Sequence, residues 1–236
     1  MKIIEQSHEI LHIDGIDRIE RAARTCYKSE EKIGCRCPSR AEFHGCPNAF
    51  PYCEPDEENC AHCAEHSSAR MIRQLIKRGH HAMLEHGSAT VRFITNRGVT
   101  HELVRHRMAS FGQESTRFVS YGGKGIEFIR PVWCDKDSRQ AFGEWQVQMQ
   151  IAEDSYNHLL ELGWRPEQAR EVLPNALKTE IVVTANYREW MWIFQLRAIG
   201  TTGRPHPQMQ ALMIPLLEEF KSRVPAVFDD LEVNNA

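Results

Sequence analysis

Polar and apolar residues alternate along four stretches of the chain, which is the pattern of a strand with one buried face. These stretches are residues 1–13, 88–95, 126–131 and 179–185. The third ends at Pro131, which cannot donate a hydrogen bond to a neighbouring strand. The sequence therefore predicts four strands, each short enough for a small sheet.

Apolar residues at helical spacing predict several helices between these strands. Asp14 is placed to cap the first helix, and Gly79 to end the second. A loop is expected to begin at Phe111, and Pro215 is expected to kink the last helix. The predicted helices cover residues 14–28, 68–79, 99–108, 136–162, 166–172 and 188–197, and a last one starts at residue 207. The pattern indicates an α+β fold with more helix than strand.

The chain has 236 residues, which is enough for one domain with a sizeable core, and we expect residues 1–236 to form it. Its net charge of −3 argues against a general nucleic-acid or membrane binder. No run of about 18 apolar residues is available to span a bilayer, and acids occupy the start where a secretory signal would be apolar. We therefore expect a cytoplasmic protein.

Residues 34–64 differ from the rest of the chain, because they hold six of the eight cysteines, four prolines and few aliphatic side chains. A segment so poor in apolar residues is predicted to be an insertion held by something other than a core. The Cys60-x-x-Cys63 pair is half of a tetrahedral zinc site, and Cys35 and Cys37 are candidates to complete it. The alternatives are Cys46 with Cys53 as the second pair, or a loop of reduced thiols.

Residues 99–121 concentrate cations and hydrogen-bonding groups around the sequence RHR at 105–107. A guanidinium pairs bidentately with phosphate and stacks on planar rings. This density predicts a site for a phosphorylated, planar ligand. The alternative is a solvated charged face of the predicted helix 99–108.

The run RHRMASFGQESTR closely resembles the signature of the flavin-dependent thymidylate synthases, which is RHR followed by seven residues and a serine. Here these are Arg105, His106, Arg107 and Ser115. Five further blocks resemble the same family in the same order, namely LEH (84–86), AREVLP (169–174), TANYREW (184–190), LR (196–197) and HPQM (206–209). The resemblance covers nearly the whole chain except the cysteine-rich insertion.

The resemblance implies a single-domain fold in which helices pack on a mostly antiparallel sheet. It also implies a homotetramer with FAD at subunit interfaces, and conversion of dUMP to dTMP. Methylenetetrahydrofolate would supply the carbon and NADPH the reducing equivalents. Two alternatives remain open: methylation of UMP by the same fold, and a zinc-containing nucleotide-binding protein that has lost the flavin.

The resemblance also implies roles for individual residues. Arg197 is expected nearest the pyrimidine, where it would stabilise developing negative charge. Ser115 could act as a nucleophile, but the spacing fixes no base beside it, so we expect it to hydrogen-bond the nucleotide. Arg197 and Ser115 are the candidate catalytic residues. The expected dUMP contacts are Glu102, Arg105, Glu114, Ser115, Thr116, Arg117, Arg170 and Arg197.

The residues that match the family's FAD contacts come from several parts of the chain. They are His86, Arg105, His106, Arg107, Gln113, Glu114, Asn186 and Arg188. Trp190, Trp192 and Phe194 are expected to serve in packing and not to form an aromatic cofactor site. Phe118, where a tyrosine is common in the family, and Trp192, where a polar residue is usual, leave the preference for deoxyribose over ribose undecided.

Overall fold

The computed structural model describes residues 1–33, 67–123, 125–134 and 139–233. The strands are β1 (Lys2–Ile4), β2 (Ser7–Ile13), β3 (Ser88–Asn96), β4 (Ser110–Gln113), β5 (Glu127–Ile129) and β6 (Lys178–Asn186). The α-helices are α1 (Asp17–Tyr27), α2 (Ser67–Lys77), α3 (Arg97–Leu103), α4 (Arg139–Glu161), α5 (Pro166–Ala169), α6 (Tyr187–Phe194), α7 (Pro207–Arg223) and α8 (Pro225–Phe228). Short 3₁₀ turns cover Glu30–Lys32, His81–His86 and Arg170–Val172, and a π-helical turn covers Gln195–Ile199.

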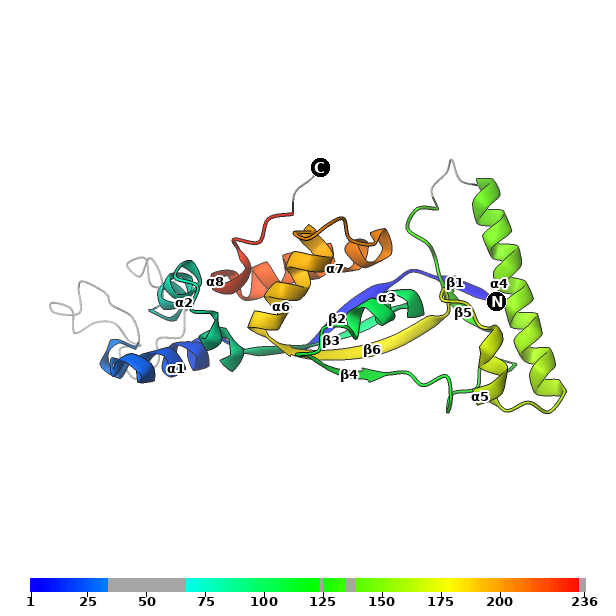
Figure 1. Cartoon of the computed structure of the whole chain (residues 1–236), viewed down its shortest axis with the longest axis horizontal. Coiled ribbons are helices and arrows are strands. Elements are labelled where there is room, and N and C mark those ends of the chain that lie inside the picture. The colour runs from blue at the N-terminus through cyan, green and yellow to red at the C-terminus, as the bar shows by residue number, and fades with distance from the viewer. Residues whose placement is uncertain (34–66, 124, 135–138, 234–236) are drawn as a thin grey trace, which may run out of the picture.

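A four-stranded antiparallel sheet in the order β2-β3-β6-β4 forms the centre of the molecule (Figure 1). The long central strands β3 and β6 pair along their whole length, from Ser88 opposite Asn186 to Asn96 opposite Lys178. A second, parallel pair joins β1 to β5. The predicted α+β class and antiparallel sheet are therefore confirmed.

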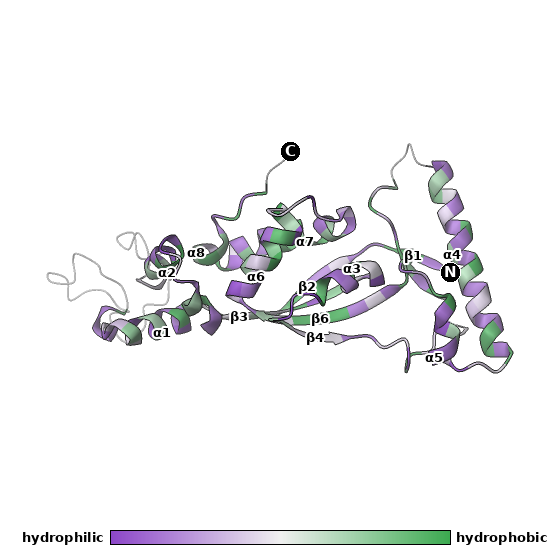
Figure 2. Ribbon diagram, in the orientation of Figure 1, coloured by the Kyte–Doolittle hydropathy of each residue, from purple (hydrophilic) through white to green (hydrophobic). Residues whose placement is uncertain are grey.

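Alternating burial on the central strands decides which face of the sheet meets the core. On β3, Val91 and Phe93 are fully buried, and Ile181 and Val183 lie beside them on β6. Helices α6 and α7 pack against this face and carry apolar residues toward it (Figure 2). Within this core the ring of Trp190 stacks on Phe194 and is tilted against Phe220. The rings of Phe194, Phe220 and Phe228 meet one another edge to face.

A smaller core lies at the other end of the sheet, where α4 crosses the β1–β5 pair (Figure 1). Phe128 of β5 and Tyr156 of α4 are fully buried there. The carboxylate of Glu153 on α4 accepts a hydrogen bond from the backbone N–H of Ile126 at 3.3 Å. This contact ties the long helix to the strand pair and so to the central sheet.

Several predicted boundaries were wrong. Residues 1–13 form two strands in two different sheets. The loop expected to begin at Phe111 is replaced there by β4, which lies at the edge of the main sheet. The helix predicted over 99–108 ends at Leu103. The early end of the helix and the presence of β4 have the same cause. The chain leaves the helix at Leu103 so that β4 can pair with its antiparallel partner β6.

Asp14 does not cap the first helix as predicted. Its carboxylate instead accepts hydrogen bonds from the backbone N–H and hydroxyl of Ser88, at 2.9 and 2.8 Å, and so joins the end of β2 to the start of β3. These bonds outweigh the cost of burial and lower the pKa of Asp14. The residue at the N-cap of α1 is Ile16, whose side chain cannot form a capping hydrogen bond.

Trp190 and Phe194 pack in the core as predicted, but the side chain of Trp192 is 45% exposed within this chain. In the described parts of the chain, no helix is both long enough and apolar enough to cross a membrane.

Candidate active site

The RHR sequence lies in the turn between α3 and β4, and this position separates its three side chains. Asn96 caps α3 by accepting a hydrogen bond from the backbone N–H of Val99 at 2.8 Å. After the helix ends, His106 turns inward and is 5% exposed. Arg105 and Arg107 on either side of it are exposed. The alternative of a solvated helix face does not hold, since the motif is not helical and its histidine is buried.

Arg197 is the centre of a hydrogen-bonded network that joins residues far apart in sequence. Its Nη1 donates to the Glu102 carboxylate at 2.7 Å, and its Nη2 donates to the Glu102 carbonyl oxygen at 3.3 Å. Its Nε donates to Nε2 of His106 at 3.2 Å. Nδ1 of His106 lies 3.3 Å from a carboxylate oxygen of Glu189. The guanidinium is therefore held along two of its edges and remains about one-fifth exposed.

His106 is electrically neutral at pH 7 in this network. Burial, aided by the positive charge of Arg197, lowers the pKa of His106 to about 4. Burial also raises the pKa of Glu189. The contact between the two side chains is therefore a hydrogen bond that involves a neutral imidazole and not an ion pair.

A π-helical turn presents Arg197 to this network. Helix α6 widens at Gln195–Ile199, and single π turns of this kind occur preferentially at functional sites. Gly200 ends the turn with φ +83°, where a Cβ would lie 2.7 Å from Cδ of Pro205. Only glycine satisfies both the backbone conformation and the close approach at this position.

The loop after β4 brings Ser115, Thr116 and Arg117 beside Arg170. The hydroxyl of Ser115 accepts a hydrogen bond from the backbone N–H of Arg117 at 3.2 Å, which stabilises the turn. Thr116 is buried and accepts a hydrogen bond from Nη1 of Arg170 at 3.2 Å. Arg117 is exposed and stacks over the ring of Phe118 at 4.9 Å. The structure thus brings together four of the residues that the sequence predicted to bind the nucleotide.

Glu114 and Gln113 are bound to the sheet in this chain. One oxygen of Glu114 accepts from the hydroxyl of Tyr121 at 3.0 Å. The other accepts from Nζ of Lys178 at 3.3 Å and from a backbone N–H of β6. The amide nitrogen of Gln113 donates to the hydroxyls of Thr100 and Thr179, at 2.9 and 3.2 Å. Both side chains anchor the loop that carries Ser115.

Of the predicted flavin contacts outside the RHR turn, Arg188 lines a cavity of about 410 Å³. Asn186 caps α6, and the exposed Arg188 lies in the first turn of this helix. Nη1 of Arg188 lies 2.6 Å from a carboxylate oxygen of Glu85. His86 is exposed at the end of the 3₁₀ turn that lines this cavity. The lining residues are Cys26, Tyr27, Leu75, Gly79, His80, His81, Ala82, Met83 and Arg188.

The exposed arginines of the RHR turn and the side chains that line this cavity fit the chemistry of FAD. Among the described residues, neither Arg105 nor Arg107 is paired with a carboxylate, so both can neutralise a pyrophosphate. The walls of the neighbouring cavity include aromatic, imidazole and thioether side chains of the kind that pack on an isoalloxazine or adenine ring.

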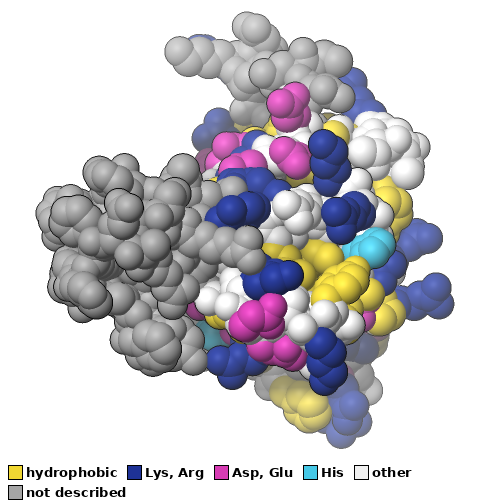
Figure 3. Space-filling view, turned by 90° about the vertical axis from the view of Figure 1, so that its left-hand side faces the viewer, with side chains coloured by type: hydrophobic (Ala, Val, Ile, Leu, Met, Phe, Trp, Pro, Cys, Tyr) yellow, Lys and Arg dark blue, Asp and Glu magenta, His cyan; other side chains and the backbone are white. Residues whose placement is uncertain are grey.

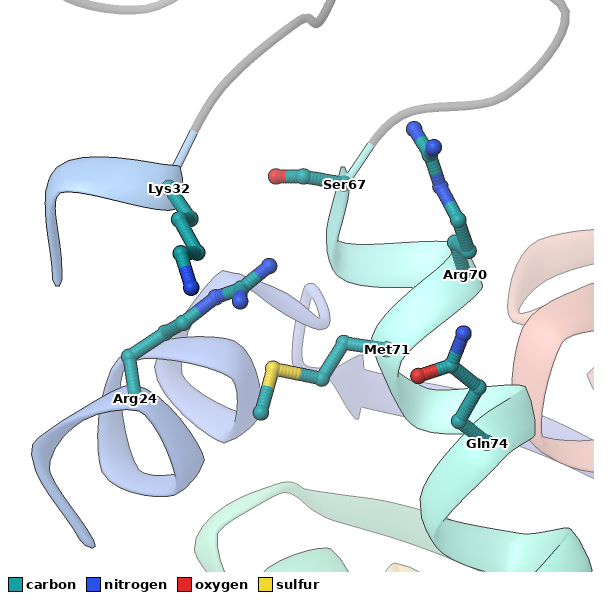
Figure 4. A pocket seen from close by; sticks show the side chains of 6 residues that line it. All are labelled: Arg24, Lys32, Ser67, Arg70, Met71 and Gln74. Atoms are coloured by element: carbon teal, nitrogen blue, oxygen red, sulfur yellow. The ribbon is translucent and has the colours of Figure 1, made fainter. Parts of the chain in front are cut away.

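A second cavity, of about 290 Å³, lies between α1 and α2 and contains none of the predicted site residues (Figure 4). The carboxylate of Glu20 is engaged by Arg24 at 3.0 Å and by the hydroxyl of Ser67 at 2.8 Å. The end of the molecule formed by residues 17–32 and 67–80 carries nine Lys and Arg against four Asp and Glu. Figure 3 shows this mainly basic surface.

The four cysteines proposed as metal ligands, Cys35, Cys37, Cys60 and Cys63, lie outside the described residues. Within the described residues, no group of three or more His, Cys, Asp and Glu side chains is arranged to hold a metal ion. Of the two cysteines outside the insertion, Cys26 is exposed and Cys134 is partly buried.

Comparison with protein families gives a match over residues 10–226 to the model described as "Thymidylate synthase complementing protein". The chain belongs to the flavin-dependent thymidylate synthase family. It is therefore an enzyme of the methyltransferase type, as the resemblance predicted.

Several members of the flavin-dependent thymidylate synthase family are similar over most of this chain. The enzyme of Geobacter sulfurreducens is 37% identical over 162 residues, which are 67% of each chain. The Corynebacterium efficiens enzyme is 36% identical over 71% of each chain. The Mycobacterium tuberculosis enzyme is 31% identical over 83% of this chain and 80% of its own.

The fold is shared with a solved structure, the UMP/dUMP methylase PolB from Streptomyces cacaoi bound with 5-Br dUMP. The TM-score is 0.74, with 97% of this chain and 96% of PolB covered. Only 20% of the residues are identical, so this likeness establishes the fold and not the substrate.

Two residues that contact the predicted site residues, Glu189 and Lys178, were not predicted from the sequence. Glu189 contacts His106, and Lys178 contacts Glu114. Lys178 offered no signal, because its partner lies 64 positions away. Glu189 follows the capping Asn186 by three residues. This spacing predicts the start of a helix, but it carries no information about a contact with His106.

Proposed function

We propose that this chain catalyses FAD-dependent methylation of dUMP at C5 to form dTMP. Methylenetetrahydrofolate is the carbon donor and NADPH the reductant. The observation that carries the proposal is the Arg197 guanidinium, which Glu102 and His106 orient beside the RHR turn in a chain of this family. When bound, FAD supplies the hydride for the reductive step.

Several residues would bind dUMP in this proposal. Arg197 stabilises the negative charge that develops on the pyrimidine, and Ser115 donates a hydrogen bond to the nucleotide. The proposed binding set also contains Glu102, Arg105, Glu114, Thr116, Arg117 and Arg170. Arg170 and Arg117 flank the loop of Ser115, which supports their assignment to the phosphate.

The proposed FAD contacts are His86, Arg105, His106, Arg107, Gln113, Glu114, Asn186 and Arg188. They come from the RHR turn, from the end of β4 and from the segments around the start of α6. Since Arg105 belongs to both proposed sets, one copy of it could serve the nucleotide and another the flavin at a subunit interface. We therefore propose a homotetramer in the cytoplasm, for which the expected native mass is four times the 27.3 kDa chain.

Methylation of UMP is the second candidate function. It is supported by the shared fold with a UMP/dUMP methylase. It is also consistent with Phe118, which is 78% exposed beside Arg117 and free to contact a ligand.

Two measurements test these proposals. Purified protein is expected to be yellow or to take up added FAD, and a colourless protein that takes up no FAD would overturn the enzyme proposal. The rate of methylation with dUMP is then compared with the rate with UMP. We expect dUMP to be the better substrate, and a preference for UMP would establish the second candidate function.

For the insertion, we propose that Cys35, Cys37, Cys60 and Cys63 hold one zinc ion. Elemental analysis of the purified chain is expected to give one zinc per chain, lost when Cys60 and Cys63 are both replaced by serine. A metal-free preparation would favour reduced thiols instead.

A further inference from the structure

Glu189 contacts the buried His106 of the RHR turn, and His106 in turn orients Arg197. It lies in the first turn of α6, and its backbone N–H is held by the capping side chain of Asn186 at 2.9 Å. Its carboxylate lies 3.3 Å from Nδ1 of His106, and its side chain is only 12% exposed. The capped helix end therefore fixes the position from which this carboxylate meets the imidazole.

The direction of each hydrogen bond follows from the donors. Nε of Arg197 always carries a hydrogen, so the Nε2 atom of His106 that it meets at 3.2 Å must accept. In a neutral imidazole the other nitrogen then carries the hydrogen. Nδ1 of His106 therefore donates to Glu189, and the carboxylate selects this tautomer.

Arg197 depends on that tautomer for one of its two supports. If His106 carried its hydrogen on Nε2, that hydrogen would face the N–H of Arg197 and the two groups would repel one another. The remaining contacts, both to Glu102, would leave the guanidinium free to rotate away from the imidazole.

We propose that Glu189 is a positioning residue, which holds His106 with its hydrogen on Nδ1 and thereby fixes the orientation of the Arg197 guanidinium toward the substrate. The role at the substrate rests on the proposed function, whereas the tautomer is a property of the protein alone. Glutamine at position 189 would preserve the role, because its amide oxygen also accepts a hydrogen bond.

The tautomer is measured first, by ¹⁵N NMR of histidine-labelled protein at pH 7, with His106→Gln used to assign the signal. The wild type and Glu189→Gln are expected to show His106 with its hydrogen on Nδ1. Glu189→Leu is expected to shift His106 toward the Nε2–H form. An unchanged tautomer in Glu189→Leu would overturn the proposal whether or not the protein methylates dUMP.

Kinetics then test the consequence for Arg197. Glu189→Leu is expected to lower kcat for dTMP formation by roughly 10- to 100-fold, because small misplacements of a charge-stabilising group have effects of this size. The KM for dUMP and the melting temperature are expected to change little, and Glu189→Gln is expected to restore most of kcat. Glu218→Leu, which replaces an exposed carboxylate of α7, is the matched control.

Two kinetic results would contradict the positioning role. One is a wild-type kcat in Glu189→Leu. The other is a kcat that falls equally in Glu189→Gln and Glu189→Leu, since this would show that the charge of Glu189 matters and not its hydrogen bond. Absence of dTMP formation by the wild type would instead count against the proposed function, and the NMR result would stand separately.

Discussion

Arg197 is the residue on which the proposed chemistry depends most. Its contacts join α3, the RHR turn and the π-helical end of α6, so three segments must be folded before it is oriented. The pairing with Glu102 spans 95 positions and could not be predicted from the sequence. What could be predicted was the kind of side chain needed, a fixed cation that stabilises charge on a pyrimidine.

Replacing Arg197 with alanine is expected to lower kcat for dUMP methylation by roughly 100-fold or more, the usual cost of removing a group that stabilises transition-state charge. The flavin absorbance of the purified protein should remain, since Arg197 is not among the proposed flavin contacts. Loss of flavin from this variant would show that the assignment of Arg197 to the nucleotide is wrong.

Ser115→Ala is expected to retain measurable turnover. The hydroxyl of Ser115 accepts a hydrogen bond from the backbone of its own turn. Among the described residues, no general base contacts it, as a nucleophile would require. Steady-state rates of the variant give the test. Complete loss of turnover, together with a covalent nucleotide adduct in the wild type, would restore the nucleophile role.

His106 gives the stability of the protein a predicted dependence on pH. Its pKa is about 4 when folded, below the ordinary value of 6.5, so the unfolded chain binds the proton more tightly. The stabilisation from the neutral imidazole is fully present above pH 6.5 and is lost as the pH falls toward 4. The difference in pKa corresponds to a loss on the order of 3 kcal/mol.

Urea unfolding of the wild type and His106→Gln from pH 7 to pH 4 measures this loss. The variant is expected to lose less stability over that range than the wild type, because its amide does not titrate. Parallel curves for the two proteins would contradict the buried, neutral state of His106.

At the scale of elements, the junction of β3 with α1 and α6 is closely packed around Gly87. A Cβ at Gly87 would lie 2.6 Å from the ring of Tyr187 and 2.9 Å from Cδ1 of Ile19. Both neighbours are fully buried and cannot move aside. Gly87→Ala is therefore expected to lower the free energy of unfolding by about 1–3 kcal/mol.

Gly15→Ala is the control for this prediction, because nothing lies within 4 Å of a Cβ at Gly15. Chemical denaturation of both variants gives the comparison. Equal stability of the two variants would contradict the close packing at Gly87.

The elements themselves were predicted with uneven success, for physical reasons. Strands β3 and β6 alternate over nine residues, so their pattern is local and was visible. Strand β4 has four residues, including a glycine, and exists because it pairs with β6 about 70 positions away. The π-helical turn at 195–199 has the same apolar spacing as an α-helix, so the sequence predicted an ordinary helix end there.

The whole molecule has features consistent with assembly into a larger complex. Helices α3, α6 and α7 lie over one face of the sheet (Figure 1), and the other face exposes Leu11 together with an ion-paired Arg92 and Glu180. Helix α4 also exposes Val147 and Ile151, one turn apart. These surfaces are candidates for the subunit contacts of the proposed tetramer, and the sequence pattern alone could not separate them from core-facing positions.

The most direct test of the proposed function follows the carbon that is transferred. Protein loaded with FAD is incubated with NADPH, dUMP and methylenetetrahydrofolate labelled with ¹³C in its methylene group, and the nucleotide product is examined by mass spectrometry. The proposal predicts dTMP carrying the label, formed only when flavin and reductant are both present. Recovery of unchanged dUMP from protein that holds FAD and is correctly folded would contradict it.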